Sequence, residues 1–394
     1  MQQQATTKTS DVESAVRARY TSGAEALEAA LCCPIEGYEP RYLAQLPREI
    51  VEKDYGCGDP SRFIGPGEVV VDLGSGSGKI AYILAQKVGP QGRVIGVDVN
   101  DAMLALARKY QDEMATKLGY ANTQFVKARI QDMALDLARV ETLLARAPLH
   151  SVEALSVFEA ECARLRREEP LVADASVDAV VSNCVLNLVR PGDKQRLFAE
   201  IFRVLKRGGR AVISDIVCDE TPTAEMQADP ELWSGCISGA LGESELLKAF
   251  EDAGFHGIEI LARSDRPWRT VQGIEFRSLT LRAWKGKQGV CLERKQAVVY
   301  KGPWKQVVDD DGHTFRRGER IAVCDKTYQI LTGANGPYGA QVVGLPPRVE
   351  VPLKEAGLFA CRGTTLRSPR ETKGESYAAT EDNSAAACTD DACC

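Results

Sequence analysis

Apolar runs alternate with amphipathic segments along residues 68–284. Short runs of branched apolar residues are typical of buried strands, and apolar residues three or four positions apart are typical of helices. Strands are predicted at 68–73, 93–98, 123–127, 177–183, 210–216, 257–262 and 275–284. Helices are predicted at 78–88, 101–118, 193–206 and 243–253. The pair Gly208-Gly209 is expected to end the 193–206 helix and lead into the next strand. This alternation favours a doubly wound α/β sheet, with the last two strands forming an antiparallel hairpin at its edge.

Other parts of the chain lack this alternation. Residues 1–20 are polar and are expected to be mobile. Residues 134–172 are longer than one connection requires and indicate an inserted helical excursion. Short β-like runs among many glycines and prolines favour a small accessory domain, and a terminal stretch rich in Ser, Thr, Glu and Ala is typical of a disordered tail. The predicted parts are an N-terminal segment 1–60, a main domain 61–288, the accessory domain 289–362 and the tail 363–394.

Composition narrows the classes of partner. The chain has 394 residues, with 49 Lys and Arg against 55 Asp and Glu, and a net charge of −6. Such a balance gives no reason to expect nucleic acid or an anionic membrane as partner. No apolar stretch approaches the roughly 20 residues that span a bilayer, and the first residues lack the basic and apolar parts of a signal peptide. The protein is therefore expected in the cytoplasm. A monomer is the default expectation, since the sequence gives no oligomeric state.

A glycine-rich loop joins the first predicted strand to the first predicted helix. Residues 72–78 read Asp-Leu-Gly-Ser-Gly-Ser-Gly. Glycine lets the backbone turn sharply and lets a ligand approach the main chain, and the helix start offers unpaired N–H groups. The second strand ends in Asp98, where an acidic residue can hold two ribose hydroxyls. The alternative is a tight turn without a ligand. The form of the loop resembles that of class I S-adenosylmethionine methyltransferases more than that of NAD enzymes.

Three of the 13 cysteines come close to this loop in the predicted sheet. Cys184 ends the fourth strand, Cys236 lies in the loop after the fifth, and Cys57 lies just before the first. Ligands of open α/β sheets bind outside the carboxyl ends of the strands. Thiolates favour soft, thiophilic elements, and trivalent arsenic takes three thiolates while keeping a nucleophilic lone pair. The alternatives are packing cysteines, as Cys162 and Cys218 are read, and a zinc site, which the missing C-x₂-C spacing disfavours.

The segments around these cysteines resemble a known family. Tyr-Gly-Cys-Gly, Ser-Asn-Cys-Val-Leu-Asn-Leu and Cys-Ile-Ser-Gly-Ala-Leu are similar to segments of arsenite S-adenosylmethionine methyltransferases, in the same order. The resemblance covers about residues 25–360. It implies that Cys57, Cys184 and Cys236 bind arsenic, and that a cysteine of the N-terminal loop forms a disulfide with Cys57 during turnover. Cys32 and Cys33 both compete for that role.

The same resemblance implies a binding site for S-adenosylmethionine. The glycine loop takes the methionine end, the end of the second strand takes the ribose and adenine, and the end of the fourth strand takes the methionine amine. Gln131 departs from the Glu that family members commonly carry, and Met103 is equally well read as a helix core residue. The expected cofactor residues are Tyr55, Asp72, Gly74, Ser75, Gly76, Asp98, Val99, Met103, Ile130, Gln131 and Asn183.

The implied fold is a seven-stranded, Rossmann-like class I methyltransferase sheet with a small C-terminal accessory domain. The implied activity is methylation of arsenite, delivered as a thiol complex, to mono- and dimethylated products in arsenic detoxification. Glutathione or thioredoxin would reduce the enzyme disulfide. Two alternatives are a class I methyltransferase of a small organic or lipid acceptor and a non-catalytic, thiol-based metalloid-binding protein. The terminal Cys393-Cys394 pair either captures arsenite or is a reactive tail.

Overall fold

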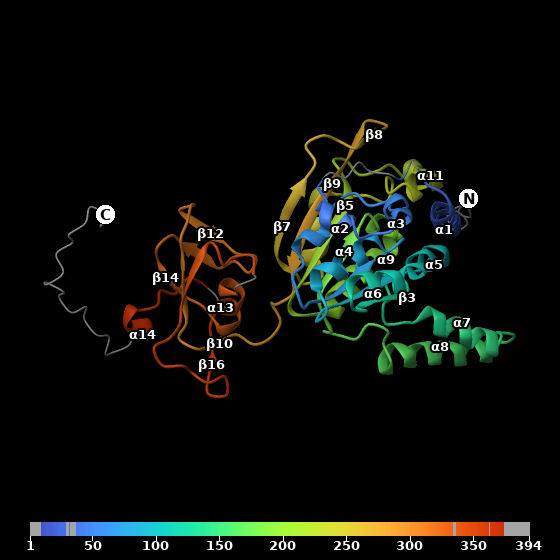
Figure 1. Cartoon of the computed structure of the whole chain (residues 1–394). Coiled ribbons are helices and arrows are strands. Elements are labelled where there is room, and N and C mark those ends of the chain that lie inside the picture. Colours follow the sequence, from blue (N-terminus) through green and yellow to red (C-terminus); the bar gives the residue numbers. More distant parts are fainter. Residues whose placement is uncertain (1–8, 29–30, 32–36, 334–335, 362, 374–394) are drawn as a thin grey trace, which may run out of the picture. The chain divides into compact units, whose positions relative to one another are not determined.

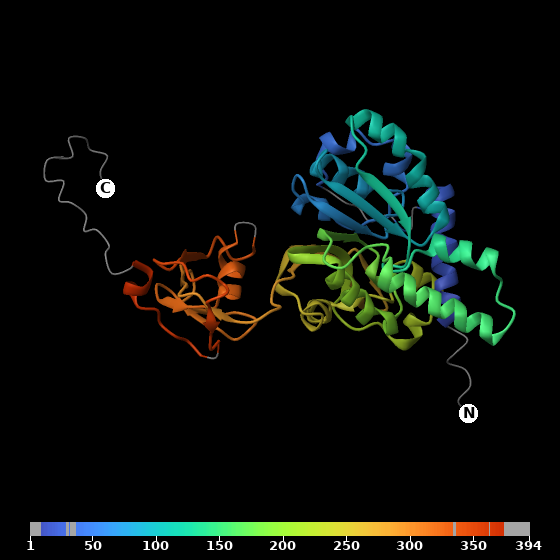
Figure 2. The ribbon, with the colours of Figure 1, turned by 90° about the horizontal axis from the view of Figure 1, so that it is seen from below.

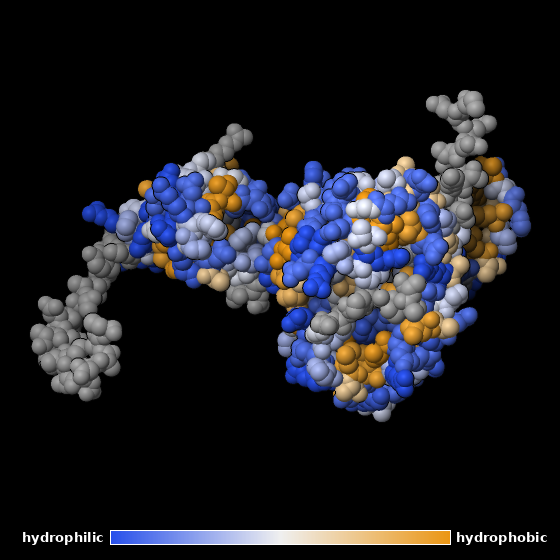
Figure 3. Space-filling view, turned by 90° about the horizontal axis from the view of Figure 1, so that it is seen from above, coloured by the Kyte–Doolittle hydropathy of each residue, from blue (hydrophilic) through white to orange (hydrophobic). Residues whose placement is uncertain are grey.

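The computed structural model describes residues 9–28, 31, 37–333, 336–361 and 363–373. Contacts divide the chain into two compact units, unit 1 from Met1 to Gly286 and unit 2 from Lys287 to Cys394 (Figure 1). In the part of the chain that is described, no helix is both long and apolar enough to cross a membrane. Polar side chains cover much of the face seen in Figure 3, and apolar side chains gather in a few places.

Unit 1 is built on one large sheet with the strand order β3-β2-β1-β4-β5-β9-β7. The first five of these strands are parallel, and β9 is antiparallel to both β5 and β7. The predicted doubly wound, Rossmann-like sheet is therefore confirmed. The predicted antiparallel pair of the last two strands at the sheet edge is confirmed too, with β7 as the edge strand and β9 between β7 and β5. The strands are β1 (Val69–Leu73), β2 (Arg93–Asp98), β3 (Thr123–Lys127), β4 (Val177–Asn183), β5 (Leu205–Cys218), β7 (His256–Arg263) and β9 (Ile274–Trp284), with the short β6 (Leu241–Gly242) on β5 and β8 (Arg269–Val271) on β9.

Helices cover both faces of this sheet (Figure 2). Successive residues of a strand face opposite sides, so Val70 and Val71 of β1 belong to two different apolar cores. Side chains of α4 and α5 fill one core, and side chains of α9 and α12 fill the other. The helices are α4 (Lys79–Val88), α5 (Asp101–Lys109), α6 (Gln111–Leu118), α9 (Pro191–Val204) and α12 (Glu243–Asp252).

Two helix boundaries differ from the prediction. The single helix predicted at 101–118 is interrupted at Tyr110, whose backbone leaves the helical region. Helix α9 ends at Val204 because Leu205 already pairs with Val177 of β4. The glycine pair that was predicted to end this helix lies inside β5 instead.

Helix α1 (Thr9–Glu25) occupies the segment that was expected to be mobile, so that expectation is wrong for its described residues. Tertiary contacts override the weak local pattern, since α1 packs against α5 and α11 (Pro230–Ser234). The Asn100 side chain donates to the carbonyl of Arg17 (3.2 Å), and Arg19 donates to the carbonyl of Glu231 (3.1 Å). The remaining short helices of unit 1 are α2 (Pro40–Leu43), α3 (Arg48–Glu52), η2 (Pro60–Phe63), η3 (Leu186–Leu188) and α10 (Ala224–Gln227).

The excursion between β3 and β4 forms two helices, α7 (Leu137–Arg146) and α8 (Val152–Glu168), which lie side by side in Figure 1. They share a small core that includes Val140, Cys162 and Leu165. Cys162 is therefore a packing residue, as its helical context suggests.

Unit 2 combines short strands with one longer helix around a core of Val298, Tyr300, Phe315, Ile321, Val323 and Leu331. Its described strands pair in three small sheets, β14-β11-β15, β12-β13 and β10-β16. The elements are β10 (Leu292–Glu293), β11 (Ala297–Tyr300), β12 (Gln306–Val308), β13 (Thr314–Arg316), β14 (Arg320–Ala322), α13 (Asp325–Thr332), β15 (Val342–Leu345), β16 (Gly357–Leu358) and α14 (Pro369–Lys373).

Residues 363–373 were expected to be disordered, but they pack onto unit 2. Arg367 donates two hydrogen bonds to the carboxylate of Glu293, at 2.7 and 2.9 Å. The backbone adds bonds from Ala322 to Thr365 and from Arg367 to Arg320. A polar composition concealed this order because bidentate ion pairs, rather than apolar residues, hold the segment.

Candidate active site

A cavity in unit 1 opens at the carboxyl ends of β1, β2 and β4. Its lining brings together residues that are far apart in the sequence, from α1 to the loop after β4. Cys184 also lines it, whereas Cys57 and Cys236 are not among the lining residues. The predicted cofactor residues in the lining are Tyr55, Asp72, Gly74, Ser75, Gly76, Asp98, Val99, Met103, Ile130, Gln131 and Asn183.

The glycine loop forms the floor of the cavity between β1 and α4. Gly74 has φ +60°, and a Cβ there would lie 2.5 Å from Cγ1 of Val185. Only glycine fits, both for backbone conformation and for space. The Gly76 N–H donates to Asp98 Oδ2 (2.9 Å), and the Asn100 N–H donates to Asp98 Oδ1 (2.8 Å). The loop and the start of α5 therefore hold the Asp98 carboxylate in one orientation.

Asp72, at the end of β1, is a buried acidic residue of the cavity lining. Its Oδ2 is buried and has no hydrogen-bond partner among the described residues. Burial raises the pKa of Asp72 well above its usual range, and the nearby Asp54 and Asp98 carboxylates raise it further. Asp54 itself pairs with Lys79 at 2.7 Å. A buried acceptor without a partner is unfavourable, so Asp72 fits a cationic or hydrogen-bond-donating ligand.

These features fit S-adenosylmethionine. That molecule carries a sulfonium, an ammonium and a ribose with two hydroxyls. Asp72 offers an unpaired acceptor for a cation, Asp98 offers carboxylate oxygens near the end of β2, and the glycine loop leaves the space that a Cβ would fill. The fit therefore rests on unsatisfied charge as well as on shape.

Asn183 at the end of β4 holds the loop that carries Cys57. Its Oδ1 accepts from the N–H groups of Cys57 (2.8 Å) and Gly58 (3.0 Å), and its Nδ2 donates to Tyr38 Oη (3.2 Å) and to the carbonyl of Gly58 (2.9 Å). A Cβ at Gly56 would lie 2.0 Å from Asn183 Nδ2. The expected contact with the methionine amine therefore competes with a structural role of this amide.

Cys184 and Cys236 share an unusual backbone conformation. Their φ values are +64° and +61°, in the left-handed region that non-glycine residues rarely adopt, and both side chains are buried. Such strain is of the order of 1–3 kcal/mol per residue and clusters at functional sites. The Cys236 thiol donates to the carbonyl of Cys184 (3.4 Å), which joins the two segments directly. Cys57 and Cys184 lie in one apolar cluster with Cys218.

Buried polar groups lock the two cysteine loops together. Lys194 Nζ donates to the carbonyls of Gly239 (2.7 Å) and Leu186 (3.4 Å), and Asp215 accepts from the Leu186 N–H (2.8 Å). Burial lowers the pKa of Lys194 to about 8 and raises the pKa of Asp215 to about 6. A Cβ at Gly239 would lie 1.9 Å from the carbonyl oxygen of Asn187. The loops after β4 and β5 are thus in direct contact.

Tyr20 is a site residue that the sequence reasoning missed. It lines the cavity, and its hydroxyl lies 3.8 Å from Cys236 Sγ. Burial raises the pKa of Tyr20, and the neighbouring Cys236 and Cys184 raise it further. Its ring also packs edge-on against Tyr55, with centroids 6.1 Å apart. No local signal pointed to it, because the segment reads as polar and α1 forms through tertiary contacts.

Cys32, Cys33 and the terminal Cys393-Cys394 pair lie outside the described residues. The disulfide expected between Cys57 and one of the first two stays a prediction.

Comparison with known families matches two regions of the chain. A family described as a methyltransferase domain matches residues 64–169 and 157–254. A second family, described as a domain of unknown function, matches residues 287–377.

Individual relatives extend over most of the chain. An arsenite methyltransferase of Aquipseudomonas alcaligenes is 30% identical over 335 residues, which are 81% of this chain and 86% of that protein. An arsenite methyltransferase of Mus musculus is 29% identical over 312 residues, or 76% and 73% of the two chains. The crystal structure of an arsenic(III) S-adenosylmethionine methyltransferase from Chlamydomonas reinhardtii is 27% identical, with a TM-score of 0.51, and the match covers 85% of this chain and 100% of that one.

Proposed function

This chain belongs to the arsenite methyltransferase family, and from that premise we propose that Cys184, Cys236 and Cys57 hold trivalent arsenic for methylation beside the cofactor cavity. S-adenosylmethionine, when bound, supplies an electrophilic methyl group on its sulfonium. The chain provides the other half of the reaction, a fixed nucleophile. Asp72 would bind the cationic methionine end, and Asp98 would bind the ribose.

The thiols act by exchange and orientation. Arsenite reaches the enzyme as a complex with a small thiol, and the cysteine sulfurs replace that thiol as their protons leave. The lone pair of thiolate-bound arsenic would then take the methyl group in line, as the carbon–sulfur bond of the sulfonium breaks and S-adenosylhomocysteine leaves. Holding both reactants in position is the main contribution of the protein, and such orientation supplies several kcal/mol. A second round on a singly methylated substrate needs only two thiolates, for which we assign Cys184 and Cys236.

A redox step completes the cycle. Methyl transfer leaves arsenic formally pentavalent, and two electrons from a pair of cysteine thiols return it to the trivalent state. The two thiols lose two protons and become a disulfide. We assign Cys57 and either Cys32 or Cys33 to this pair, with glutathione or thioredoxin as the external reductant by thiol–disulfide exchange.

One observation carries the proposal. Cys184 lines the cavity that holds the predicted cofactor residues, and the Cys236 thiol bonds to the Cys184 carbonyl. One strained, buried cysteine thus lines a cavity whose unpaired carboxylate oxygen fits a cation, and a second one is bonded to its backbone. A packing cysteine needs neither the left-handed backbone nor this neighbour.

The direct test is methylation of arsenite by the purified chain with S-adenosylmethionine and glutathione, followed by chromatographic separation of arsenic species. We expect mono- and dimethylated arsenic from the unsubstituted chain and from the control Cys162→Ser, and none from Cys184→Ser. Donor binding, measured by calorimetry, should survive in Cys184→Ser. Normal methylation by Cys184→Ser would remove the proposed arsenic site, and donor binding without any methylated arsenic in the unsubstituted chain would favour another acceptor.

The redox pair needs a separate test, because its candidates differ by one position. The methylated arsenic formed by Cys32→Ser and by Cys33→Ser is measured twice. The first assay has one molecule of S-adenosylmethionine per enzyme, and the second has excess S-adenosylmethionine and reductant. The variant that lacks the partner of Cys57 should complete a single turnover but fail at repeated turnover. The other variant should turn over repeatedly, as the unsubstituted chain does. Repeated turnover in both single variants and in their combination would refute the disulfide step.

A further inference from the structure

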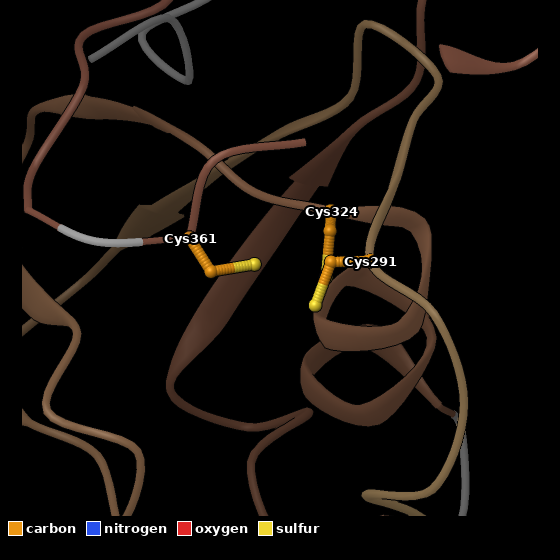
Figure 4. Close-up of side chains that lie close together, drawn as sticks. All are labelled: Cys291, Cys324 and Cys361. Carbon is orange, nitrogen blue, oxygen red and sulfur yellow. The ribbon is translucent and has the colours of Figure 1, made fainter. Parts of the chain in front are cut away.

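Unit 2 contains its own group of three cysteine thiols. The sulfur atoms of Cys291, Cys324 and Cys361 all lie within 4.8 Å of one another. Figure 4 shows the three side chains gathered at one point from three separate stretches of chain. Cys324 is buried, and the other two are partly accessible.

Backbone pairing brings the three residues together. Cys291 directly precedes β10, and Cys361 follows β16, which pairs antiparallel with β10. The Phe359 N–H donates to the carbonyl of Cys291 (2.9 Å) and extends this pairing toward Cys361. Cys324 is the N-cap residue of α13, where its Sγ accepts from the Thr327 N–H (3.4 Å). The cluster is therefore built into the unit by one strand pair and one helix start.

The surroundings favour an anionic sulfur in the cluster. Partial burial raises the pKa of the Cys291 thiol, but hydrogen bonds from Cys361 and Cys324 and the charge of Lys326 outweigh it, so the pKa lies below its usual range. Burial and the bond to Cys291 raise the pKa of Cys361. The sulfur of Cys291 therefore has two thiols and the Lys326 ammonium group around it. Thiolates, not thiols, are the ligands of thiophilic ions.

We propose that Cys291, Cys324 and Cys361 form a second binding site for trivalent arsenic, held by three sulfur ligands within unit 2. The choice of arsenic rests on the function proposed above. Binding forms three As–S bonds, and the three hydroxide ligands of arsenous acid leave as water with the three thiol protons. No oxidant or reductant is needed.

The number of ligands distinguishes arsenic from zinc. Structural zinc sites almost always have four protein ligands in a tetrahedron. Within the described residues, the group of potential ligands here contains three thiols. Trivalent arsenic is satisfied by three sulfurs in a pyramid and needs no fourth ligand. A disulfide would use only two of the sulfurs and would leave the third without a partner.

The test counts arsenic in the full-length chain with the first site removed. In a Cys184→Ser, Cys236→Ser background, the protein is kept reduced with a phosphine, incubated with arsenite and passed through gel filtration, and bound arsenic is measured per chain. Adding Cys291→Ser, Cys324→Ser or Cys361→Ser should each remove about one arsenic per chain, and the control Cys162→Ser should remove none. Cysteines elsewhere are present in every variant and contribute equally. X-ray absorption should give three sulfur neighbours for the arsenic that these substitutions remove.

Three results would overturn the proposal. The first is unchanged arsenic content in all three variants. The second is one zinc per purified chain that depends on Cys291 and that arsenite does not displace. The third is a Cys291–Cys361 disulfide that persists in phosphine and blocks uptake. Cys324→Ser keeps a side-chain acceptor at the helix start, so a folded variant is available. Failure of the proposed methyltransferase function would give a different result, since the unsubstituted chain would then form no methylated arsenic.

Discussion

The two cysteine clusters of this chain are built in different ways. In unit 1, Cys184 and Cys236 both have a left-handed backbone. Cys184 follows β4 and lines a cavity with an unpaired carboxylate oxygen, and Cys236 lies between α11 and β6 and donates to the Cys184 carbonyl. In unit 2, Cys291 and Cys361 flank a short strand pair, and Cys324 caps a helix. The first arrangement joins thiols to a cofactor cavity, as a transfer reaction requires. The second gathers three sulfurs around one point, which binding alone requires.

The two units also differ in how a buried carboxyl group is paired. In the cavity of unit 1, burial raises the pKa of Asp72, and its Oδ2 has no hydrogen-bond partner among the described residues, so this carboxyl lacks the stabilisation that a ligand would supply. In unit 2, His313 pairs with Asp309, and hydrogen bonds from His313 lower the pKa of that carboxyl despite its burial. The unpaired oxygen of Asp72 thus indicates a ligand, whereas the Asp309–His313 pair stabilises the fold of unit 2.

The largest effect should come from Gly56→Ala. The new Cβ would lie 2.0 Å from Asn183 Nδ2, so the Cys57 loop and the Asn183 amide must move apart. Misplacement of reacting groups by about 1 Å lowers rates roughly 100-fold, and we expect a loss of arsenite methylation at least that large. Arsenic uptake that depends on Cys291 should not change.

Gly65→Ala is the matched control for this substitution. A Cβ there has only Glu68 Oε2 near it, at 3.9 Å, and so it has room. Initial rates of both variants under saturating donor and arsenite give the comparison. If Gly56→Ala were as active as Gly65→Ala, Asn183 would not position Cys57 for the reaction.

Asp72→Asn should have the next largest effect, on the affinity for S-adenosylmethionine. A hydrogen bond to a charged group contributes about 1.5–3 kcal/mol, which corresponds to a roughly 10- to 100-fold weaker binding constant. Calorimetric titration measures it, with the exposed Asp112→Asn on α6 as control. Arsenite binding to either cluster should stay the same. Equal donor affinity in the two variants would show that Asp72 does not face the cationic end of the ligand.

Local patterns in the sequence predict some of these features and not others. The glycine loop and Asp98 are readable because a strand, a turn and a helix follow one another within a short stretch. The position of β9 inside the sheet is not readable, because antiparallel insertion depends on pairing with β5 and β7 rather than on the strand's own residues. Tyr20 was missed because the α1 segment is polar, and only its packing against α5 and α11 shows that it belongs to the site.

The cluster of unit 2 was missed for a related reason. Cys291, Cys324 and Cys361 have no metal-binding spacing, and their proximity depends on the register of β10 against β16 and on where α13 begins. Cys184 and Cys236 were predicted from their places after the fourth and fifth strands, together with the resemblance of their flanking segments to a family. Without such segments, residues far apart in sequence give no signal until tertiary structure brings them together.

A smaller effect should separate the two roles of Cys324, as ligand and as helix cap. Cys324→Ser and Cys324→Ala both remove the thiol and should abolish the same arsenic uptake. Only serine keeps a side-chain acceptor for the Thr327 N–H, and losing an N-cap acceptor destabilises a protein by about 1 kcal/mol. Urea unfolding of unit 2, monitored by hydrogen exchange in α13, should therefore give a lower free energy of unfolding for Cys324→Ala than for Cys324→Ser. Equal stability would mean that Cys324 contributes to unit 2 through packing alone.

The smallest effect should be a pH-dependent one at His313. A hydrogen bond to Asp309 raises the pKa of His313 above its usual value of about 6.5. A raised pKa in the folded state means that the folded chain binds the proton more tightly than the unfolded chain. The stabilisation is therefore fully present below the unfolded pKa, and it is lost as the pH rises through the higher folded pKa.

His313→Gln should lower protection from hydrogen exchange in the β12–β13 hairpin by about 0.5 kcal/mol near pH 6 and by less near pH 9. The exposed His150 offers a control, since His150→Gln should leave that hairpin unchanged at both values. A His313→Gln effect that grows with pH would contradict the His313–Asp309 ion pair. Only a neutral hydrogen bond would then stabilise the turn, and the contrast between a paired Asp309 and an unpaired Asp72 would no longer rest on charge.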